Sequence, residues 1–142
     1  MAGCVFCAIV AGDAEASIVH RDGLTTAFMD LRAFHPGHTL VVPNLHVPDI
    51  FALDDATGAA LMAATARVAR AVRAAFAPDG INIMQSNGAA AGQEVFHLHL
   101  HVLPRKRDDA LISYRRGSYE RARADLDADA ARIRVALETR TP

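Results

Sequence analysis

The chain has 142 residues, a length that suits one compact domain and leaves little room for two. Of these residues 51% are hydrophobic, and 15 basic against 16 acidic side chains give a formal net charge of −1. This composition excludes global disorder, and it argues against binding of nucleic acid or an anionic membrane through a uniformly charged surface. Seven histidines stand out, because imidazole is both a common metal ligand and a nucleophile or acid–base group near neutral pH.

The N-terminus has no basic stretch before its first apolar residues, and no apolar run approaches the roughly 20 residues that span a membrane. We therefore predict a soluble, cytoplasmic protein. The two cysteines, Cys4 and Cys7, are too close in sequence for a stapling disulfide, which indicates metal or redox chemistry in a reducing compartment. Their C-x-x-C spacing lets two thiolates reach one zinc ion, and histidines would have to complete the four ligands. Buried structural cysteines and a redox pair are the alternatives.

Short strands are expected at residues 18–21 and 25–30, around the turn residues Asp22 and Gly23, and a third at 39–42 before Pro43. A helix is expected over residues 54–76, where apolar side chains recur at helical spacing and aspartates stand at the N-terminal end.

A fourth strand is expected at residues 81–85, after Pro78-Asp79-Gly80 ends the helix. A fifth is expected at 95–103, and a second amphipathic helix at about 118–138. The predicted fold class is α+β, a single domain over residues 1–142 with a mainly antiparallel five-stranded sheet and two main helices.

Alternation in the segment 95–103 places His97, His99 and His101 on one face of the expected strand. Residues two apart on a strand lie about 6.5 to 7 Å apart, so the three imidazoles could bind a metal or divide catalytic work. A purely structural role is disfavoured, because each ring nitrogen would need a buried partner.

A small-residue loop, Gly88 to Gly92 followed by Gln93, precedes this strand. Glycine lets backbone N–H groups approach a phosphate closely, although an ordinary turn is the alternative.

The sequence resembles the histidine triad (HIT) family, in its bacterial branch with a zinc-binding C-x-x-C motif. The family signature His-x-His-x-His stands here at residues 97–101, and further family segments precede it in order over residues 4–105. These segments are Cys4 to Gly12, Ala27 to Asp30, Pro36 to Pro43, His46, Asn87-Gly88 and Ala91 to Gln93. The C-terminal helix lies outside this match.

The resemblance implies a HIT-like fold and a nucleotide hydrolase or transferase that acts on the α-phosphate of a purine nucleotide, with adenosine favoured. His99 would attack phosphorus, and water would release the nucleoside monophosphate from a nucleotidyl-imidazole intermediate. The other nitrogen of His99 must then be held by an acceptor, for which we expect a backbone carbonyl. Candidate substrates are nucleoside phosphoramidates, phosphate esters and dinucleoside polyphosphates.

The same resemblance implies a role for each remaining site residue. His101 would contact the α-phosphate or leaving group, and His38 would orient the triad from beneath. Asp30 would accept hydrogen bonds from the ribose, while Asn87, Gln93 and the backbone near Gly92 would donate to phosphate.

The resemblance further implies a structural zinc bound by Cys4, Cys7, His46 and His97, and a homodimer that would cover a strand edge. His20 and His35 receive no role and are expected on the surface. Glu94 departs from the serine or threonine of many relatives, and as an anion it would repel phosphate if it pointed inward. Alternatives to the enzyme are a nucleotide-binding or sensing protein with incidental catalysis, and a zinc hydrolase with its metal on all three triad histidines.

Overall fold

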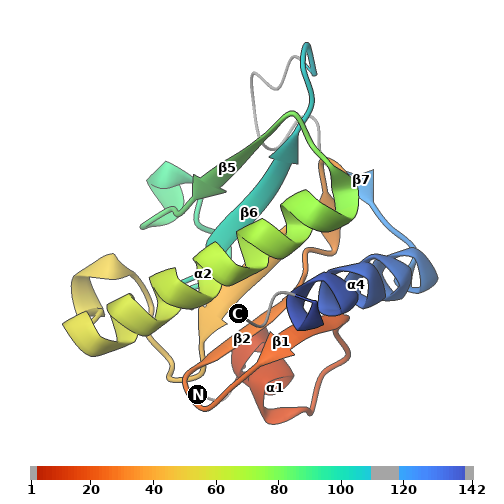
Figure 1. Ribbon diagram of the computed structural model, residues 1–142. Coiled ribbons are helices and arrows are strands. Elements are labelled where there is room, and N and C mark those ends of the chain that lie inside the picture. Colours follow the sequence, from red (N-terminus) through yellow and green to blue (C-terminus); the bar gives the residue numbers. More distant parts are fainter. Residues whose placement is uncertain (1–2, 110–118, 140–142) are drawn as a thin grey trace.

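A computed structural model describes residues 3–109 and 119–139 of the chain (Figure 1). Its elements in chain order are α1 (Val5–Ala11), β1 (Ile18–Arg21), β2 (Thr25–Met29), β3 (Arg32–Ala33), β4 (Thr39–Pro43), the 3-10 turn η1 (Ile50–Ala52), α2 (Asp55–Phe76), β5 (Gly80–Met84), the 3-10 turn η2 (Ala89–Ala91), β6 (Leu100–Arg105), β7 (Tyr119–Glu120) and α4 (Arg123–Glu138).

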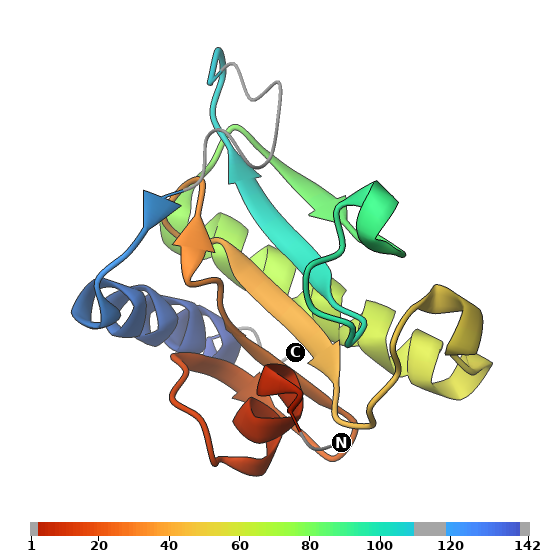
Figure 2. The same cartoon turned by 180° about the vertical axis from the view of Figure 1, so that it is seen from behind.

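Within these described residues, five strands form one antiparallel sheet in the order β1-β2-β4-β6-β5. The long helices α2 and α4 lie together on one face of the sheet, as Figure 1 and the reverse view in Figure 2 show. The predicted α+β class, with an antiparallel five-stranded sheet and two main helices, is confirmed. Among residues 3–109 and 119–139, no helix is both long and apolar enough to cross a membrane.

Both faces of the central strands β2 and β4 are buried, so their side chains alternate between two apolar clusters. Ala27, Met29 and Val41 pack in the cluster beneath α2 and α4. Phe28 and Leu40 pack in a second cluster on the opposite face, together with residues of α1. The sheet is therefore sandwiched between two long helices and one short one.

Two predicted boundaries are wrong by five residues, and the others differ by no more than two. The strand expected at 95–103 begins only at Leu100. Before that point the antiparallel ladder between β4 and β6 cannot continue, because Pro43 of β4 has no N–H to donate. The carbonyl of Pro43 accepts instead from the His97 ring, and the N–H of Leu98 donates to the Val47 carbonyl. The helix expected from residue 118 begins at Arg123, because residues 119 and 120 pair with β3; residue 118 itself lies outside the described residues.

The C-terminal helix is anchored by both apolar and polar contacts. Leu126 and Ile133 are fully buried in the main core. Arg132 lies over the ring of Phe76, 4.2 Å from its centroid, and the Ser17 hydroxyl donates to Asp127 over 2.6 Å. Helix α4 is thus part of the packed core rather than an appendage.

We predict that Ile133→Ala lowers the free energy of unfolding by about 2–5 kcal/mol, because it removes buried methyl groups and leaves a cavity. Urea denaturation followed by circular dichroism measures this change. The matched control is Val135→Ala on the same helix, where the side chain is 60% exposed and the effect should stay within about 0.5 kcal/mol. Equal effects of the two substitutions would contradict the packing of α4 described here.

Candidate functional site

Strand alternation brings three polar side chains to the face of the sheet that α2 and α4 leave uncovered. Asp30 follows β2 in phase with Phe28, and His38 precedes β4 in phase with Leu40, on the side of the second cluster. His101 is opposite Leu40 in the ladder between β4 and β6. Residues that are far apart in sequence therefore converge because each belongs to the same face of neighbouring strands.

The three side chains lie within hydrogen-bond or ion-pair distance of one another. His38 Nε2 is 3.0 Å from His101 Nδ1, and Asp30 Oδ2 is 3.3 Å from His38 Nε2 and 3.7 Å from His101 Nδ1. The backbone reinforces this arrangement, since the N–H of Asp30 donates to the His38 carbonyl over 3.0 Å. His38 has no exposed surface and His101 is 9% exposed, so these two imidazoles form the buried part of the site.

His99 is held in one orientation at the entrance to β6. Its Nδ1 lies 2.7 Å from the carbonyl oxygen of His97, so Nδ1 carries the proton and donates, and Nε2 keeps a lone pair. The backbone carbonyl expected as its acceptor is confirmed. The ring of Phe6 packs edge-on against His99, with centroids 5.2 Å apart, and the ring of His101 lies 5.1 Å away.

Burial keeps these imidazoles neutral. It lowers the pKa of His38 to about 3, with a further contribution from His35. Burial, His38 and His99 together lower the pKa of His101 to about 3, against the opposing effect of Asp30. Burial also lowers the pKa of His99, partly opposed by its hydrogen bond to the His97 carbonyl. At neutral pH each ring therefore offers one lone pair.

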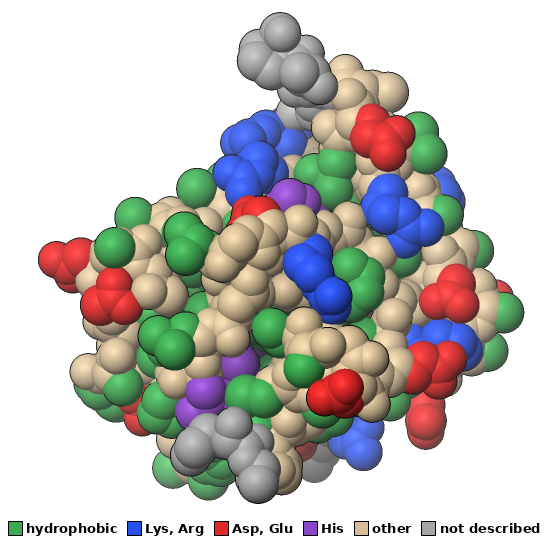
Figure 3. Space-filling view, turned by 90° about the horizontal axis from the view of Figure 1, so that it is seen from below, with side chains coloured by type: hydrophobic (Ala, Val, Ile, Leu, Met, Phe, Trp, Pro, Cys, Tyr) green, Lys and Arg blue, Asp and Glu red, His purple; other side chains and the backbone are tan. Residues whose placement is uncertain are grey.

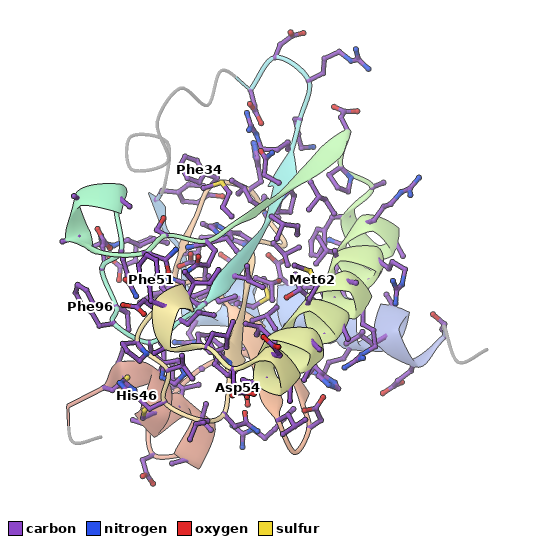
Figure 4. All side chains as sticks on the ribbon, turned by 90° about the vertical axis from the view of Figure 1, so that its left-hand side faces the viewer. Phe34, His46, Phe51, Asp54, Met62 and Phe96 are labelled. Atoms are coloured by element: carbon purple, nitrogen blue, oxygen red, sulfur yellow. The ribbon has the colours of Figure 1, made fainter. Side chains whose placement is uncertain are left out.

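A group of four possible metal ligands, the Cys₂His₂ cluster, brings together Cys4, Cys7, His46 and His97. Their candidate ligand atoms all lie within 4.8 Å of one another. Figure 4 shows the labelled His46 beside α1, the helix that carries Cys7. The sulfur of Cys7 is 3.3 Å from Nδ1 of His46 and 3.5 Å from Nδ1 of His97, and the sulfur of Cys4 is 3.6 Å from Nδ1 of His97. Tetrahedral zinc with ordinary bond lengths separates sulfur and nitrogen ligands by about 3.5 Å, so the donor set fits that ion.

The second nitrogen of His97 supports the same interpretation. Its Nε2 donates to the Pro43 carbonyl over 2.8 Å, which leaves Nδ1 unprotonated and aimed at the two sulfurs. Burial and the neighbouring Cys4 raise the pKa of the Cys7 thiol. A bound cation would reverse that preference, because it stabilises the thiolate.

The glycine–alanine loop is closed by two amide side chains. Both Nε2 hydrogens of Gln93 are donated to carbonyls, of Pro48 and Val95, and its Oε1 accepts from the N–H of Gly88. Asn87 accepts from the N–H of Ile50 over 2.8 Å. Direct donation from Gln93 to a phosphate, which the family resemblance implies, would require one of its present bonds to break.

Gly92 has a φ of +93°, in the left-handed region that favours glycine, where it ends the turn η2. Glu94, two residues after Gly92, is exposed, with one carboxylate oxygen 4.0 Å from Nη1 of Arg32. A negative charge at this position therefore faces an arginine on β3 at the protein surface.

Two histidines that were expected on the surface are half-buried. His20 Nε2 lies 3.0 Å from Asp22, and His35 Nε2 lies 3.2 Å from Asp109. His35 is paired with an aspartate 74 residues away, which the surrounding sequence did not indicate, whereas Asp22 lies two residues from His20 and is exposed.

Sequence reasoning missed two aromatic contacts of the site. Phe6 packs edge-on against both His97 and His99, and Phe34 stacks over His38 with centroids 6.4 Å apart. The position of Phe6 between the two cysteines was the available signal, because any fold that brings the C-x-x-C turn to His97 carries that ring with it. On the face of the molecule that Figure 3 shows, histidines occupy only small areas.

The structure defines a class of protein in which an α+β fold carries an imidazole cluster beside a Cys₂His₂ cluster, and comparison with known proteins agrees with it. A family model described as the HIT domain matches residues 11–108. An uncharacterized HIT-like protein of Mycobacterium tuberculosis is 42% identical over 134 residues, which cover 94% of this chain and 92% of that protein. The chain belongs to the HIT family.

Two further relatives bear on the site. The crystal structure of a zinc-bound histidine triad family protein from Mycobacterium smegmatis has a TM-score of 0.84 at 40% identity, covering 96% of this chain and 94% of that one. The adenylylsulfatase HINT3 of Arabidopsis thaliana is 32% identical over 130 residues, which cover 92% of this chain and 65% of that protein.

The buried imidazoles predict how stability depends on pH. Unfolded histidine has a pKa near 6.5, whereas that of His101 in the folded protein is about 3, so between these values the unfolded chain binds the extra proton. The contribution to stability is complete above about pH 6.5 and is lost as pH falls, by up to about 1.4 kcal/mol per pH unit for one histidine.

We therefore predict that His101→Gln flattens the fall in unfolding free energy between about pH 7 and pH 5, as measured by urea denaturation. Both proteins keep the Cys₂His₂ cluster, so any proton uptake there cancels in the comparison. Parallel curves for the two proteins would show that His101 does not titrate abnormally.

Proposed function

We propose that this protein is a nucleotide hydrolase or transferase in which His99 is the nucleophile. The orientation of His99 is the observation that carries this proposal. With its proton on Nδ1 donated to the His97 carbonyl, its Nε2 lone pair is available for attack at neutral pH. If the proton were on Nε2 instead, that nitrogen would have no lone pair with which to attack phosphorus.

The proposed reaction proceeds in two displacements at the α-phosphorus. Nε2 of His99 forms a bond to phosphorus as the bond to the leaving group breaks, and the leaving group departs with the electron pair and gains a proton. Water then attacks phosphorus, releases the nucleoside monophosphate and returns the imidazole. His101, held by His38 at 3.0 Å, would contact the phosphate or the leaving group, and Asp30 would accept from the ribose hydroxyls.

The proposed substrates are nucleoside phosphoramidates, phosphate esters or dinucleoside polyphosphates, with adenosine as the favoured base. The similarity to a relative named as an adenylylsulfatase supports an adenylyl group. Asn87, Gly92 and Gln93 form the loop that would border the phosphate, and the exposed Glu94 paired with Arg32 leaves that border free of an inward carboxylate.

We further propose that Cys4, Cys7, His46 and His97 bind a structural zinc ion. When bound, the ion would close the N-terminal turn onto the segment before β6 and take no part in the reaction. Two cysteines kept as metal ligands also suit the reducing cytoplasm, where we place the protein. Strand β5, which pairs within the described residues only with β6, leaves one edge open for a homodimer.

We predict that His99→Ala lowers turnover of a competent nucleotide substrate by more than about a thousandfold, because no covalent intermediate can form. Rapid-quench trapping of the nucleotidyl-protein on a panel of adenosine and guanosine substrates measures this. Nucleotide affinity by calorimetry and the circular dichroism spectrum should stay close to wild type, and His20→Gln, remote from the triad, is the control.

An undiminished rate in His99→Ala would overturn the mechanism. Binding without turnover by the wild-type protein across the whole panel would favour the alternative function, a nucleotide-binding or sensing protein.

We predict that removal of the Cys₂His₂ ion acts through the fold. Cys7→Ser, or prolonged chelation, should lower the melting temperature by more than about 5 °C, since about 1 kcal/mol shifts it by 2–4 °C in a chain of this size. Differential scanning fluorimetry with metal analysis measures this, and activity should decline only as the folded fraction declines. Immediate loss of activity with an unchanged melting temperature would instead favour a catalytic metal on the triad.

A further inference from the structure

We propose that Asp30, His38 and His101 form a second divalent-cation site, separate from the Cys₂His₂ cluster and suited to an ion of the zinc class. The three ligand atoms would be Oδ2 of Asp30, Nε2 of His38 and Nδ1 of His101. They come from the ends of three adjacent strands, β2, β4 and β6, and all lie within 4.8 Å of one another.

The spacing of these atoms matches one triangular face of a metal-centred tetrahedron. With zinc bonds of about 2.0–2.1 Å to nitrogen and oxygen, tetrahedral angles separate neighbouring ligand atoms by about 3.3–3.4 Å. The observed separations are 3.0, 3.3 and 3.7 Å. Small shifts of a few tenths of an ångström would therefore equalise the three edges without moving the backbone.

The donor set also favours binding. Two neutral imidazoles and one carboxylate make the nitrogen-and-oxygen set that borderline cations such as Zn²⁺ and Co²⁺ accept in open, three-ligand sites. His38 is completely buried, whereas the side chains of Asp30 and His101 are 13% and 11% exposed. The fourth position would therefore face solvent on the side of Asp30 and His101.

Binding requires a proton rearrangement that the rings can make. His38 Nε2 and His101 Nδ1 now face each other at 3.0 Å, a distance that fits one proton between them. Both nitrogens must present lone pairs to the ion, so the two ring protons would reside on Nδ1 of His38 and Nε2 of His101. Each imidazole keeps one proton, and no proton is released from the pair.

An ion at this site would inhibit the reaction, an inference that rests on the proposed function. It would occupy the carboxylate that we assign to the ribose hydroxyls and fix the proton position on His101. Nucleotide and cation would then exclude each other, and the activity would respond to the free concentration of zinc-class ions.

Cobalt titration of protein loaded with one equivalent of zinc, which the two thiolates of the Cys₂His₂ cluster select, tests the site without any measurement of activity. Four-coordinate Co²⁺ gives visible d–d absorption, and binding to cysteine adds a sulfur-to-cobalt charge-transfer band. We expect one added Co²⁺ per chain with d–d absorption and no charge-transfer band. The absence of this binding, or its appearance only with the sulfur band, would overturn the proposal.

Matched variants locate the ion. Asp30→Asn and His101→Gln should each weaken Co²⁺ binding by at least about tenfold, because each removes one of three ligands. His99→Asn and His20→Gln, which alter an adjacent imidazole and a surface His–Asp pair, should leave the affinity unchanged. Equal weakening by His99→Asn would place the ion on the triad face and overturn this ligand set. Circular dichroism of each variant verifies the fold.

Competition separates this inference from the proposed function. Adenosine is the probe, because it carries a ribose but no phosphate that could chelate cobalt. We expect adenosine to reduce the d–d absorption of the wild-type protein. Cobalt binding that persists at saturating adenosine would overturn the inhibitory role. Absence of turnover on every nucleotide would refute the proposed function, and the cobalt titration would still show whether the cation site exists.

Discussion

His97 makes contacts in three directions, and the position of His99 depends on all of them. Its Nδ1 faces the sulfurs of Cys4 and Cys7, its Nε2 donates to the Pro43 carbonyl, and its own carbonyl accepts from His99. The ring is fully buried, so each contact forms in a poorly solvated environment where its geometry is strongly enforced. The N-terminal turn, the end of β4 and the proposed nucleophile are thereby fixed relative to one another.

The three imidazoles of the site carry no positive charge at neutral pH. Burial holds His38, His99 and His101 in the neutral form, and the carboxyl group of Asp30 lies beside His38 and His101. A chain with net charge −1 can thus provide lone pairs and oriented N–H groups without a basic patch. An anionic substrate would be recognised through local donors, and the near-neutral composition is compatible with that kind of recognition.

The alternation of strands was readable from the sequence, and it accounts for the sheet and for the shared face of Asp30, His38 and His101. What could not be predicted was the residue at which β6 begins. Period-two alternation continues from residue 95 to 103, but Pro43 on the neighbouring strand ends the ladder, so His97 turns toward the cysteines while His101 stays in the sheet. The partner of His35 depends on a tertiary contact, because Asp109 lies 74 residues from His35.

Gly37, which precedes His38, has a φ of +92°, and a Cβ there would lie only 2.8 Å from Cδ2 of Phe76. The last turn of α2 is therefore seated directly on the backbone that leads into His38. Because Arg132 of α4 also lies over the Phe76 ring, one aromatic side chain contacts both the C-terminal helix and the backbone next to His38. A segment outside the matched residues 11–108 is thus connected by packing to the backbone that carries His38.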